Sequence, residues 1–240
     1  MTPYFQDDAV TIYHGDCREI VPSLGRFDLL LTDPPYGLGD RWTGGGTWQH
    51  HAGLYAQAKK WDQEAATAEQ IMALAECANV AIVWGGNYFG LPPSRGWLAW
   101  VKPQRMHTVA DFELAWTNID FPAKAFDALR NPDGRREHPT QKPLTLMSWC
   151  IGQADRANAG DVQTILDPFA GSGTTGRAAK DLGRKAVLIE REERYCEIAA
   201  RRMGQGVLDF GTANAEAHGR AVARTVQPLV VHSSSEGGRE

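Results

Sequence analysis

Short apolar runs alternate with amphipathic helical patterns along most of the 240-residue chain. This alternation is typical of a mainly parallel β-sheet with helices on both faces. The expected strands are residues 9–16, 27–33, 79–86, 96–102, 111–118, 163–171 and 185–190, and the expected helices are 67–78, 142–154, 174–183 and 192–203. The sequence therefore predicts one large α/β domain, or such a domain with a small subdomain.

The composition limits the classes of protein that fit. A net charge of −4 gives no general basic field, so contacts to nucleic acid would have to come from local patches. The four cysteines have no Cys-x-x-Cys spacing, so we expect reduced thiols in an intracellular protein and no metal site. No apolar run reaches the roughly 18 residues of a membrane span, and the N-terminus shows no signal-peptide pattern.

Two long stretches fit no regular element. Residues 38–60 are rich in Gly, Trp and His, and residues 119–137 carry several basic side chains among Pro, Asn and Gly. Loops of this length inside a compact domain are usually functional or disordered. We expect a domain over residues 1–210 with short recognition segments at about 38–60 and 103–137, followed by a disordered tail over 211–240.

The strand at 27–33 ends abruptly on Asp33-Pro34-Pro35-Tyr36. Proline cannot donate to a sheet ladder and holds its preceding residue extended, so the strand must end in a stiff turn that displays a carboxylate and an aromatic ring. A carboxylate and the Pro34 carbonyl could each accept one N–H of an amino group on a nucleobase and orient its nitrogen for attack. Tyr36 could stack on the base, which would have to leave the duplex.

A second motif, Gly171-x-Gly173-x-x-Gly176, follows one expected strand and opens a helix, and Glu190 ends the next strand. Glycines there allow close approach to a ligand, and the acid can accept hydrogen bonds from ribose hydroxyls. By itself this pattern also fits a nicotinamide-dependent oxidoreductase. Asp167, which precedes the glycines, could bind an ammonium group such as that of S-adenosylmethionine, and a dehydrogenase has no need of the Asp33 turn.

Together, TDPPYG (32–37) and DPFAGSGTTG (167–176) resemble the motifs of the amino-group DNA methyltransferases, which modify adenine N6 or cytosine N4. The catalytic motif precedes the glycine loop, as in the β group of that family. Further similar segments are HGDCREIVPSL (14–24), WGGNYF (84–89), HPTQKPLTLM (138–147) and LIEREERYCEIAARRM (188–203). The resemblance implies a Rossmann-like seven-stranded sheet, circularly permuted and mostly parallel with one antiparallel strand. In the unpermuted order the strand at 9–16 would be third and the strand at 163–170 first.

The resemblance also implies a role for individual residues. Asp33, Pro34, Pro35 and Tyr36 would form the catalytic motif. The residues expected to hold S-adenosylmethionine are Asp16 at its adenine, Glu190 at its ribose, and Asp33, Thr140, Lys142, Asp167, Phe169, Gly171, Gly173 and Thr174. The residues expected to contact DNA are Arg41, Trp42, Asn87, Tyr88, Arg105, Arg135 and Arg136. His138 we interpret as structural.

The function expected from this resemblance is methylation of adenine N6 in double-stranded DNA, because cytosine-N4 enzymes usually carry Ser in place of Asp33. Cytosine N4 stays the nearest alternative, and an oxidoreductase or an inactive DNA-binding subunit is more distant, since both motifs are intact. A short recognition region favours a short site or a homodimer. The chain shows no nuclease, so a restriction–modification role would need a separate protein, and we expect the cytoplasm of a bacterial or phage-infected cell.

Overall fold

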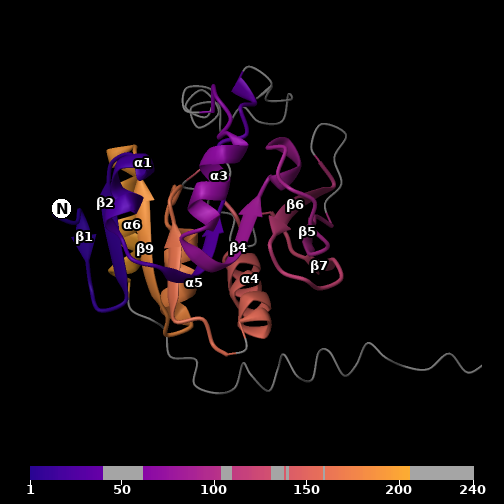
Figure 1. Cartoon of the computed structure of the whole chain (residues 1–240). Helices are drawn as coiled ribbons and strands as arrows, with labels where there is room; N and C mark the ends of the chain where they lie inside the picture. Colours follow the sequence, from indigo (N-terminus) through magenta and orange to yellow (C-terminus); the bar gives the residue numbers. More distant parts are fainter. Residues whose placement is uncertain (40–61, 104–109, 131–137, 139–140, 159, 206–240) are drawn as a thin grey trace, which may run out of the picture. The chain divides into compact units, whose positions relative to one another are not determined.

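The computed structural model describes residues 1–39, 62–103, 110–130, 138, 141–158 and 160–205. Among these, Met1–Gln205 belong to one compact unit built on a nine-stranded sheet (Figure 1). The strands are β1 Phe5–Gln6, β2 Val10–His14, β3 Phe27–Thr32, β4 Ala78–Trp84, β5 Trp97–Val101, β6 Phe112–Thr117, β7 Lys124–Asp127, β8 Thr164–Asp167 and β9 Lys185–Glu190. The helices are α1 Cys17–Ile20, α3 Ala68–Ala75, α4 Leu144–Ala157, α5 Thr174–Asp181 and α6 Glu193–Met203, with 3₁₀ turns η1 Val21–Ser23 and η4 Gly86–Tyr88.

The strands lie in the order β1-β2-β9-β8-β3-β4-β6-β5-β7. Strands β2, β9, β8, β3 and β4 are mutually parallel, and β6 runs antiparallel between β4 and β5. On one side of the central strand β8 lie β9 and then β2, and on the other side lie β3 and then β4. Strand β8 thus takes the first place and β2 the third place of the unpermuted order, so the predicted permutation is confirmed. The chain order reverses between β8 and β3, which is where open α/β sheets bind their ligands.

The predicted number of strands is wrong, because two short edge strands extend the sheet to nine. Strand β1 pairs antiparallel with β2. The sheet therefore has two antiparallel strands, β1 and β6, instead of the one expected. Strand β7 pairs parallel with β5 inside the stretch 119–137, which the sequence indicated to be irregular. Its four residues, KAFD, have no distinct apolar alternation. Pairing with the edge of β5, rather than local propensity, makes this segment a strand.

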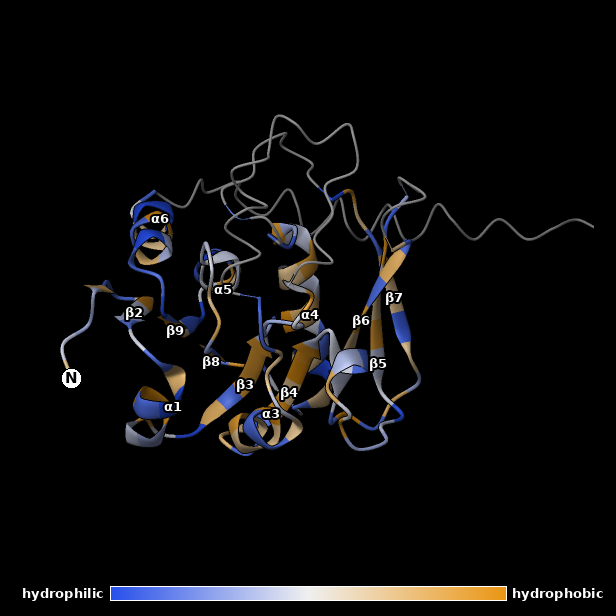
Figure 2. Ribbon diagram, turned by 90° about the horizontal axis from the view of Figure 1, so that it is seen from above, coloured by the Kyte–Doolittle hydropathy of each residue, from blue (hydrophilic) through white to orange (hydrophobic). Residues whose placement is uncertain are grey.

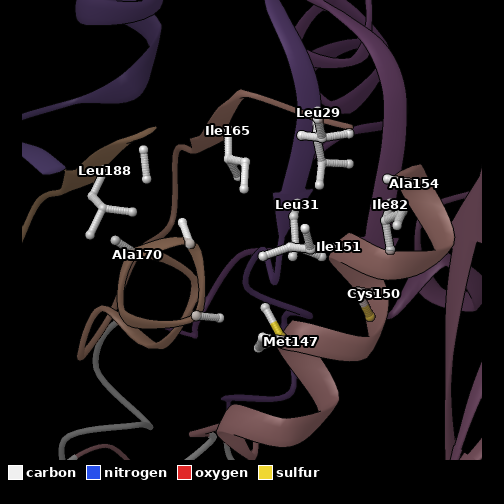
Figure 3. Packing of buried hydrophobic residues seen from close by; sticks show 14 of the residues in the cluster. Leu29, Leu31, Ile82, Met147, Cys150, Ile151, Ala154, Ile165, Ala170 and Leu188 are labelled. Atoms are coloured by element: carbon white, nitrogen blue, oxygen red, sulfur yellow. The ribbon is translucent and has the colours of Figure 1, made fainter. Parts of the chain in front are cut away.

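Helices cover both faces of the sheet, as predicted. Figure 2 shows α4, α5 and α6 on one face and α1 and α3 on the other. Along β3, Leu29 and Leu31 pack into the core under α4 and α5, whereas Leu30 packs into the core under α3. Figure 3 shows Leu29 and Leu31 facing the α4 side chains Met147 and Ile151. A strand buried on both faces explains the continuous apolar run that the sequence shows before Asp33.

Helices α3, α4, α5 and α6 begin within two residues of their predicted starts, whereas the short helix α1 was not predicted. Thr67 caps α3 by accepting a hydrogen bond from the Gln70 backbone, and the Gln70 side chain accepts one from the Thr67 backbone. This reciprocal capping box satisfies two amides at the start of the helix. Pro143 precedes α4, where its missing N–H costs little. None of the helices in the described ranges is both long and apolar enough to cross a membrane.

Side chains fix the register of β3 against β8 at both ends. At the amino end, the Asp28 carboxylate accepts hydrogen bonds from the backbone amides of Gln163 and Thr164, each at 2.9 Å. At the carboxyl end, the Thr32 hydroxyl donates to Asp167 at 2.8 Å. The strand that leads into Asp33 and the strand that leads into the glycine loop therefore end side by side.

Truncation of the core on β3 tests this packing. Leu31 is fully buried, so Leu31→Ala should lower the free energy of unfolding by about 2–5 kcal/mol through lost burial and a cavity. Urea denaturation followed by circular dichroism measures this. Leu129→Ala is the matched control at an exposed leucine and should change the free energy by less than about 0.5 kcal/mol. Equal effects of the two variants would contradict the core assignment.

Candidate active site

A cavity of about 690 Å³ opens at the carboxyl edge of the sheet, beside the point where β8 and β3 part. Its volume lies within the range of small-molecule sites. The predicted site residues that line it are Asp16, Asp33, Pro35, Lys142, Asp167, Phe169, Gly171, Thr174 and Glu190. The turn after β3 and the glycine loop after β8 thus share one cavity, although they are far apart in the sequence.

The Asp33 turn is held rigidly at the rim of this cavity. Tyr36 donates its hydroxyl proton to Oδ1 of Asp33, and Lys142 Nζ donates to Oδ2 at 2.5 Å. Asp62, itself buried, accepts hydrogen bonds from the Gly37 and Leu38 amides. Further, Pro35 accepts a hydrogen bond from the Ala66 amide, so residues 62–66 hold the turn from outside. The prolines and these contacts together leave the turn little freedom.

A chain of alternating charges, made of two partly buried carboxylates and two buried lysines, extends from Asp33 to β6. Lys142 Nζ lies 2.5 Å from Asp33 and 3.2 Å from Glu113 Oε2, and Lys102 Nζ lies 2.5 Å from Glu113 Oε1. The two lysine side chains are only 5% and 2% exposed. Burial raises the pKa of Glu113, but the two ammonium groups outweigh this and lower it to about 2. Glu113 and Lys102 were not predicted; an acid inside the apolar run of β6 was the only signal in the sequence.

Aromatic rings pack against the turn on its other side. The Tyr36 ring stacks on Tyr88, with centroids 4.9 Å apart, and meets Phe89 edge-on at 5.9 Å. Tyr88 is 50% exposed, so its outer face is open. Gly85 makes the close approach possible: its φ is +72°, and a Cβ there would lie 2.1 Å from Tyr36 Cε1. One face of Tyr36, which the sequence predicted to stack on a base, is therefore covered by Tyr88.

The glycine loop is tied to the strand beside it. The Glu190 carboxylate accepts hydrogen bonds from the backbone amides of Gly171 and Glu192, both at 2.8 Å. Gly173 has a φ of +77°, and a Cβ there would lie 2.8 Å from the Ala199 methyl group of α6. Gly171 lines the cavity, whereas Gly173 does not line it and instead allows the loop to pack closely against α6. Arg202 of α6 supports the same loop by donating to the Ser172 carbonyl at 2.7 Å.

Asp167 lines the cavity, and three groups of the protein donate hydrogen bonds to it. Its carboxylate accepts hydrogen bonds from the hydroxyls of Thr32 and Thr175 and from the Phe169 amide. Burial nevertheless dominates and raises the pKa of Asp167 to about 6. Glu190 also has a raised pKa, again because of burial.

The far end of the cavity differs from the Asp33 end. Asp16 caps α1 and pairs with Arg18 at 2.5 Å, which lowers the pKa of the carboxyl group. Apolar side chains Val21 and Leu74 line the wall nearby, so a flat, partly apolar group fits here. His138 lines the cavity and packs edge-on against Tyr195 at 4.4 Å. Burial lowers the pKa of His138 to about 3, in agreement with a structural role.

Not every predicted site residue can be located. Thr140 and the predicted DNA contacts Arg41, Trp42, Arg105, Arg135 and Arg136 lie outside the described residues. Asn87 and Tyr88 are exposed beside the Asp33 turn. Asp62 was missed because a single Asp before a helix carries no recognisable signal. In the described ranges, no group of three or more His, Cys, Asp or Glu is arranged to hold a metal ion.

Comparison with known proteins identifies the family. A model of the DNA methylases matches residues 82–201, which is half of the chain. The chain belongs to the DNA methylase family. The matched segment runs from β4 to α6 and so includes the glycine loop, Glu113 and Lys142, but not the Asp33 turn.

Two curated relatives of the family share shorter segments. The type II methyltransferase M.HinfI of Haemophilus influenzae is 39% identical over 77 residues, which are 32% of this chain and 20% of that protein. The type II methyltransferase M2.LlaDCHI of Lactococcus lactis subsp. cremoris is 46% identical over 70 residues, which are 29% of this chain and 24% of that protein. The matched segments thus span only about a quarter or less of these relatives.

Two solved structures have the same fold. The M1.HpyAVI–SAM complex matches with a TM-score of 0.53 and 22% identity, covering 82% of this chain and 100% of that one. The Pvu II DNA methyltransferase, described as cytosine-N4-specific, matches with a TM-score of 0.56 and 17% identity, covering 90% and 93%. At these identities the likeness concerns the fold alone.

The contact between Gly85 and Tyr36 can be tested against a matched glycine. Gly90 has a similar φ of +63° but open space where a Cβ would lie, so Gly90→Ala should cost only the backbone strain, about 1–2 kcal/mol. Gly85→Ala must also displace the Tyr36 ring and should lose a further 1–3 kcal/mol or so of unfolding free energy. Chemical denaturation measures both variants. Equal losses would mean that the ring moves freely and is not fixed by this contact.

The raised pKa of Asp167 predicts a pH-dependent stability. The folded pKa of about 6 exceeds the ordinary aspartate pKa of 3.8, so the folded state binds more protons between these values and stability falls as the pH rises through them. Relative to Asp167→Asn, the wild type should lose about 2 kcal/mol of unfolding free energy between pH 4 and pH 7. Denaturation of both proteins across this range measures the difference. A difference that is independent of pH would show that Asp167 is ionised at its ordinary pKa.

Proposed function

We propose that the chain transfers a methyl group from S-adenosylmethionine to the N6 amino group of adenine in DNA. The observation that carries this proposal is the shared cavity: the Asp33 carboxylate lies at the rim of the same pocket as the glycine loop and Glu190. A pocket for a nucleoside cofactor thereby opens directly onto an acceptor for an amino group. Membership of the DNA methylase family supports the reaction class.

The residues of the cavity fit S-adenosylmethionine, the cofactor of this family. When bound, this cofactor supplies an electrophilic methyl group on a sulfonium centre. Glu190, at the carboxyl end of β9, is the group we assign to the ribose, and Asp16 the group for the adenine, beside the apolar wall at Val21 and Leu74. Asp167, Phe169, Gly171 and Thr174 would surround the methionine portion. Gly173 would act indirectly by letting the loop pack on α6.

Asp33 would act as the acceptor for the substrate amino group. An exocyclic amine donates its lone pair into the ring and is a weak nucleophile. A carboxylate that accepts one N–H, with the Pro34 carbonyl accepting the other, would favour a tetrahedral nitrogen whose lone pair is available for attack. Because the turn is fixed by its prolines and by Asp62, the nitrogen would be held in line with the methyl donor. After transfer, the surplus proton on nitrogen would pass to Asp33 and then to water.

The aromatic rings beside the turn would hold the flipped base. Stacking is worth about 1–3 kcal/mol per base. Tyr88 covers one face of Tyr36, so this face could receive a base only if Tyr88 shifted, whereas Tyr88 itself is 50% exposed. Asn87 and Tyr88 are therefore proposed DNA contacts, together with Arg41, Trp42, Arg105, Arg135 and Arg136. Double-stranded DNA is the proposed substrate, and a homodimer stays a prediction.

Adenine is preferred over cytosine because of Asp33. The family includes enzymes for both N6 and N4 amino groups, and the Asp33 chemistry serves either base. The resemblance links Asp, rather than Ser, at this position with adenine. The N4 group of cytosine is the alternative that the same assay detects.

The test is methylation of unmethylated genomic DNA with labelled S-adenosylmethionine, followed by mass spectrometry of the nucleosides. The wild type should form N6-methyladenine, and Asp33→Ala should reduce the rate at least about a hundredfold while binding of S-adenosylhomocysteine persists. Asp161→Ala, at an exposed carboxylate that pairs with Arg184 at 3.2 Å outside the cavity and the proposed recognition segments, is the control and should retain full activity.

Three results would count against parts of the proposal. N4-methylcytosine in place of N6-methyladenine would change the substrate base. Full activity of Asp33→Ala would remove Asp33 from the mechanism. Folded protein that binds the cofactor but labels no DNA would overturn DNA as the substrate.

A further inference from the structure

The ammonium group of Lys142 is surrounded by polar groups of the protein itself, although it was expected to contact the cofactor. Its ammonium group donates to Asp33 Oδ2 at 2.5 Å and to the Tyr36 hydroxyl at 3.3 Å, and it lies 3.2 Å from Glu113 Oε2. Its side chain is 5% exposed. These three partners account for the three protons of an ammonium group. The resemblance assigned Lys142 to the cofactor, but the geometry directs it to the catalytic turn.

We propose that Lys142 is the fixed counter-ion of Asp33, that it shares its charge with Glu113, and that this balance keeps Asp33 ionised as the acceptor for the substrate amino group. This inference rests on the proposed function, because it names residues that position and charge Asp33. In our scheme Lys142 and Glu113 act through Asp33 and are positioning residues.

The physical need for a counter-ion follows from burial. Removing a carboxylate from water favours its neutral form, which cannot accept an N–H at the protonated oxygen. Burial indeed raises the pKa of Asp33, the Glu113 charge raises it further, and the Lys142 charge opposes both. For Lys142, burial lowers the pKa, but Asp33 and Glu113 outweigh burial and raise it, so the lysine stays charged.

The charges of the network balance. Asp33 and Glu113 each carry one negative charge, and Lys142 and Lys102 each carry one positive charge. Lys102 binds the second oxygen of Glu113, so Glu113 does not take Lys142 away from Asp33. A buried pair that lost one partner would leave an uncompensated charge.

Other titratable groups face the network and must be considered in its pH dependence. Those that interact with Asp33 or Lys142 are Tyr36, Asp167, His138 and Cys150, while Tyr88 acts on Tyr36 and Arg130 acts on Lys102. Burial raises the pKa of Tyr36 well above its ordinary value and lowers that of His138 to about 3, so both are neutral near pH 7. Burial, with a smaller contribution from the Asp33 charge, raises the pKa of Asp167 to about 6, so Asp167 is a neighbour whose charge changes below pH 7.

The experiment compares two variants whose effects must have opposite signs. Lys142→Met removes the counter-ion and should move the acid limb of the kcat–pH profile upward by at least about one pH unit. Glu113→Gln keeps an acceptor for Lys142 but removes the competing charge, so the limb should move downward. The KM for S-adenosylmethionine should change less than about threefold in both. Loss of folding stability alone would not move the limb in opposite directions.

Matched controls separate the network from a general loss of ion pairs. Lys180 forms an ion pair with Asp7 at 2.5 Å, the same distance as between Lys142 and Asp33, and this pair lies outside the cavity. Lys180→Met should therefore leave the pH profile unchanged. If Lys142→Met fails to fold, Glu113→Gln decides the question by itself. A shift of both variants in the same direction, no shift in Glu113→Gln, or a tenfold rise in KM with an unmoved acid limb in Lys142→Met would overturn the inference.

A readout without catalysis distinguishes this inference from the proposed function. The ¹³C carboxyl signal of Asp33, assigned by its absence in Asp33→Asn, should titrate at higher pH in Lys142→Met and at lower pH in Glu113→Gln. If the wild type methylates no DNA, the proposed function fails, and the carboxyl titration still tests the counter-ion. Unchanged titration of Asp33 in both variants would overturn the inference even in an active enzyme.

Discussion

The parallel pairing of β3 with β8 brings together the two motifs that the sequence separates. Asp28 binds backbone amides of the opposite strand at one end of this pair, and Thr32 binds Asp167 at the other. These hydrogen bonds fix the register, so that Asp33 and the glycine loop leave the sheet at the same level. A slip of one residue would turn Asp167 away from the cavity and separate the acceptor from the cofactor loop.

The two sides of the site around this strand pair are held rigid in different ways. On the Asp33 side, stiffness comes from the prolines, from Asp62 and from a balanced group of buried charges. On the glycine side, it comes from backbone amides bound to Glu190 and from close packing on α6. The first arrangement suits an amino group that must be oriented, and the second suits a ligand that the backbone must approach closely. Each motif therefore has the local structure that its proposed role requires.

Much of this architecture could be predicted because it is written locally in the sequence. Strand β9 and helix α6 follow from apolar runs and helical spacing, and the turn at Asp33 follows from two prolines. The segment Lys124–Asp127 could not be predicted, since the edge of β5 makes it a strand. Glu113, Lys102 and Asp62 were also missed, because each has its partner on a distant element and none stands in a recognisable motif. The stack of Tyr88 on Tyr36 depends on Gly85, whose role appears only when the ring is placed beside it.

The permuted chain order has a consequence for how the protein folds. The ion pair between Lys142 and Asp33 joins residues 109 apart in the sequence, and the hydrogen bond between Thr32 and Asp167 joins residues 135 apart. Closing such long loops is entropically costly, and folds dominated by distant contacts form slowly. The consecutive elements α5, β9 and α6 can form early from local contacts, whereas the active site exists only after β3 has paired with β8. Cofactor binding would therefore report completed folding, and a nascent chain would stay without a formed site until its last strands have been synthesised.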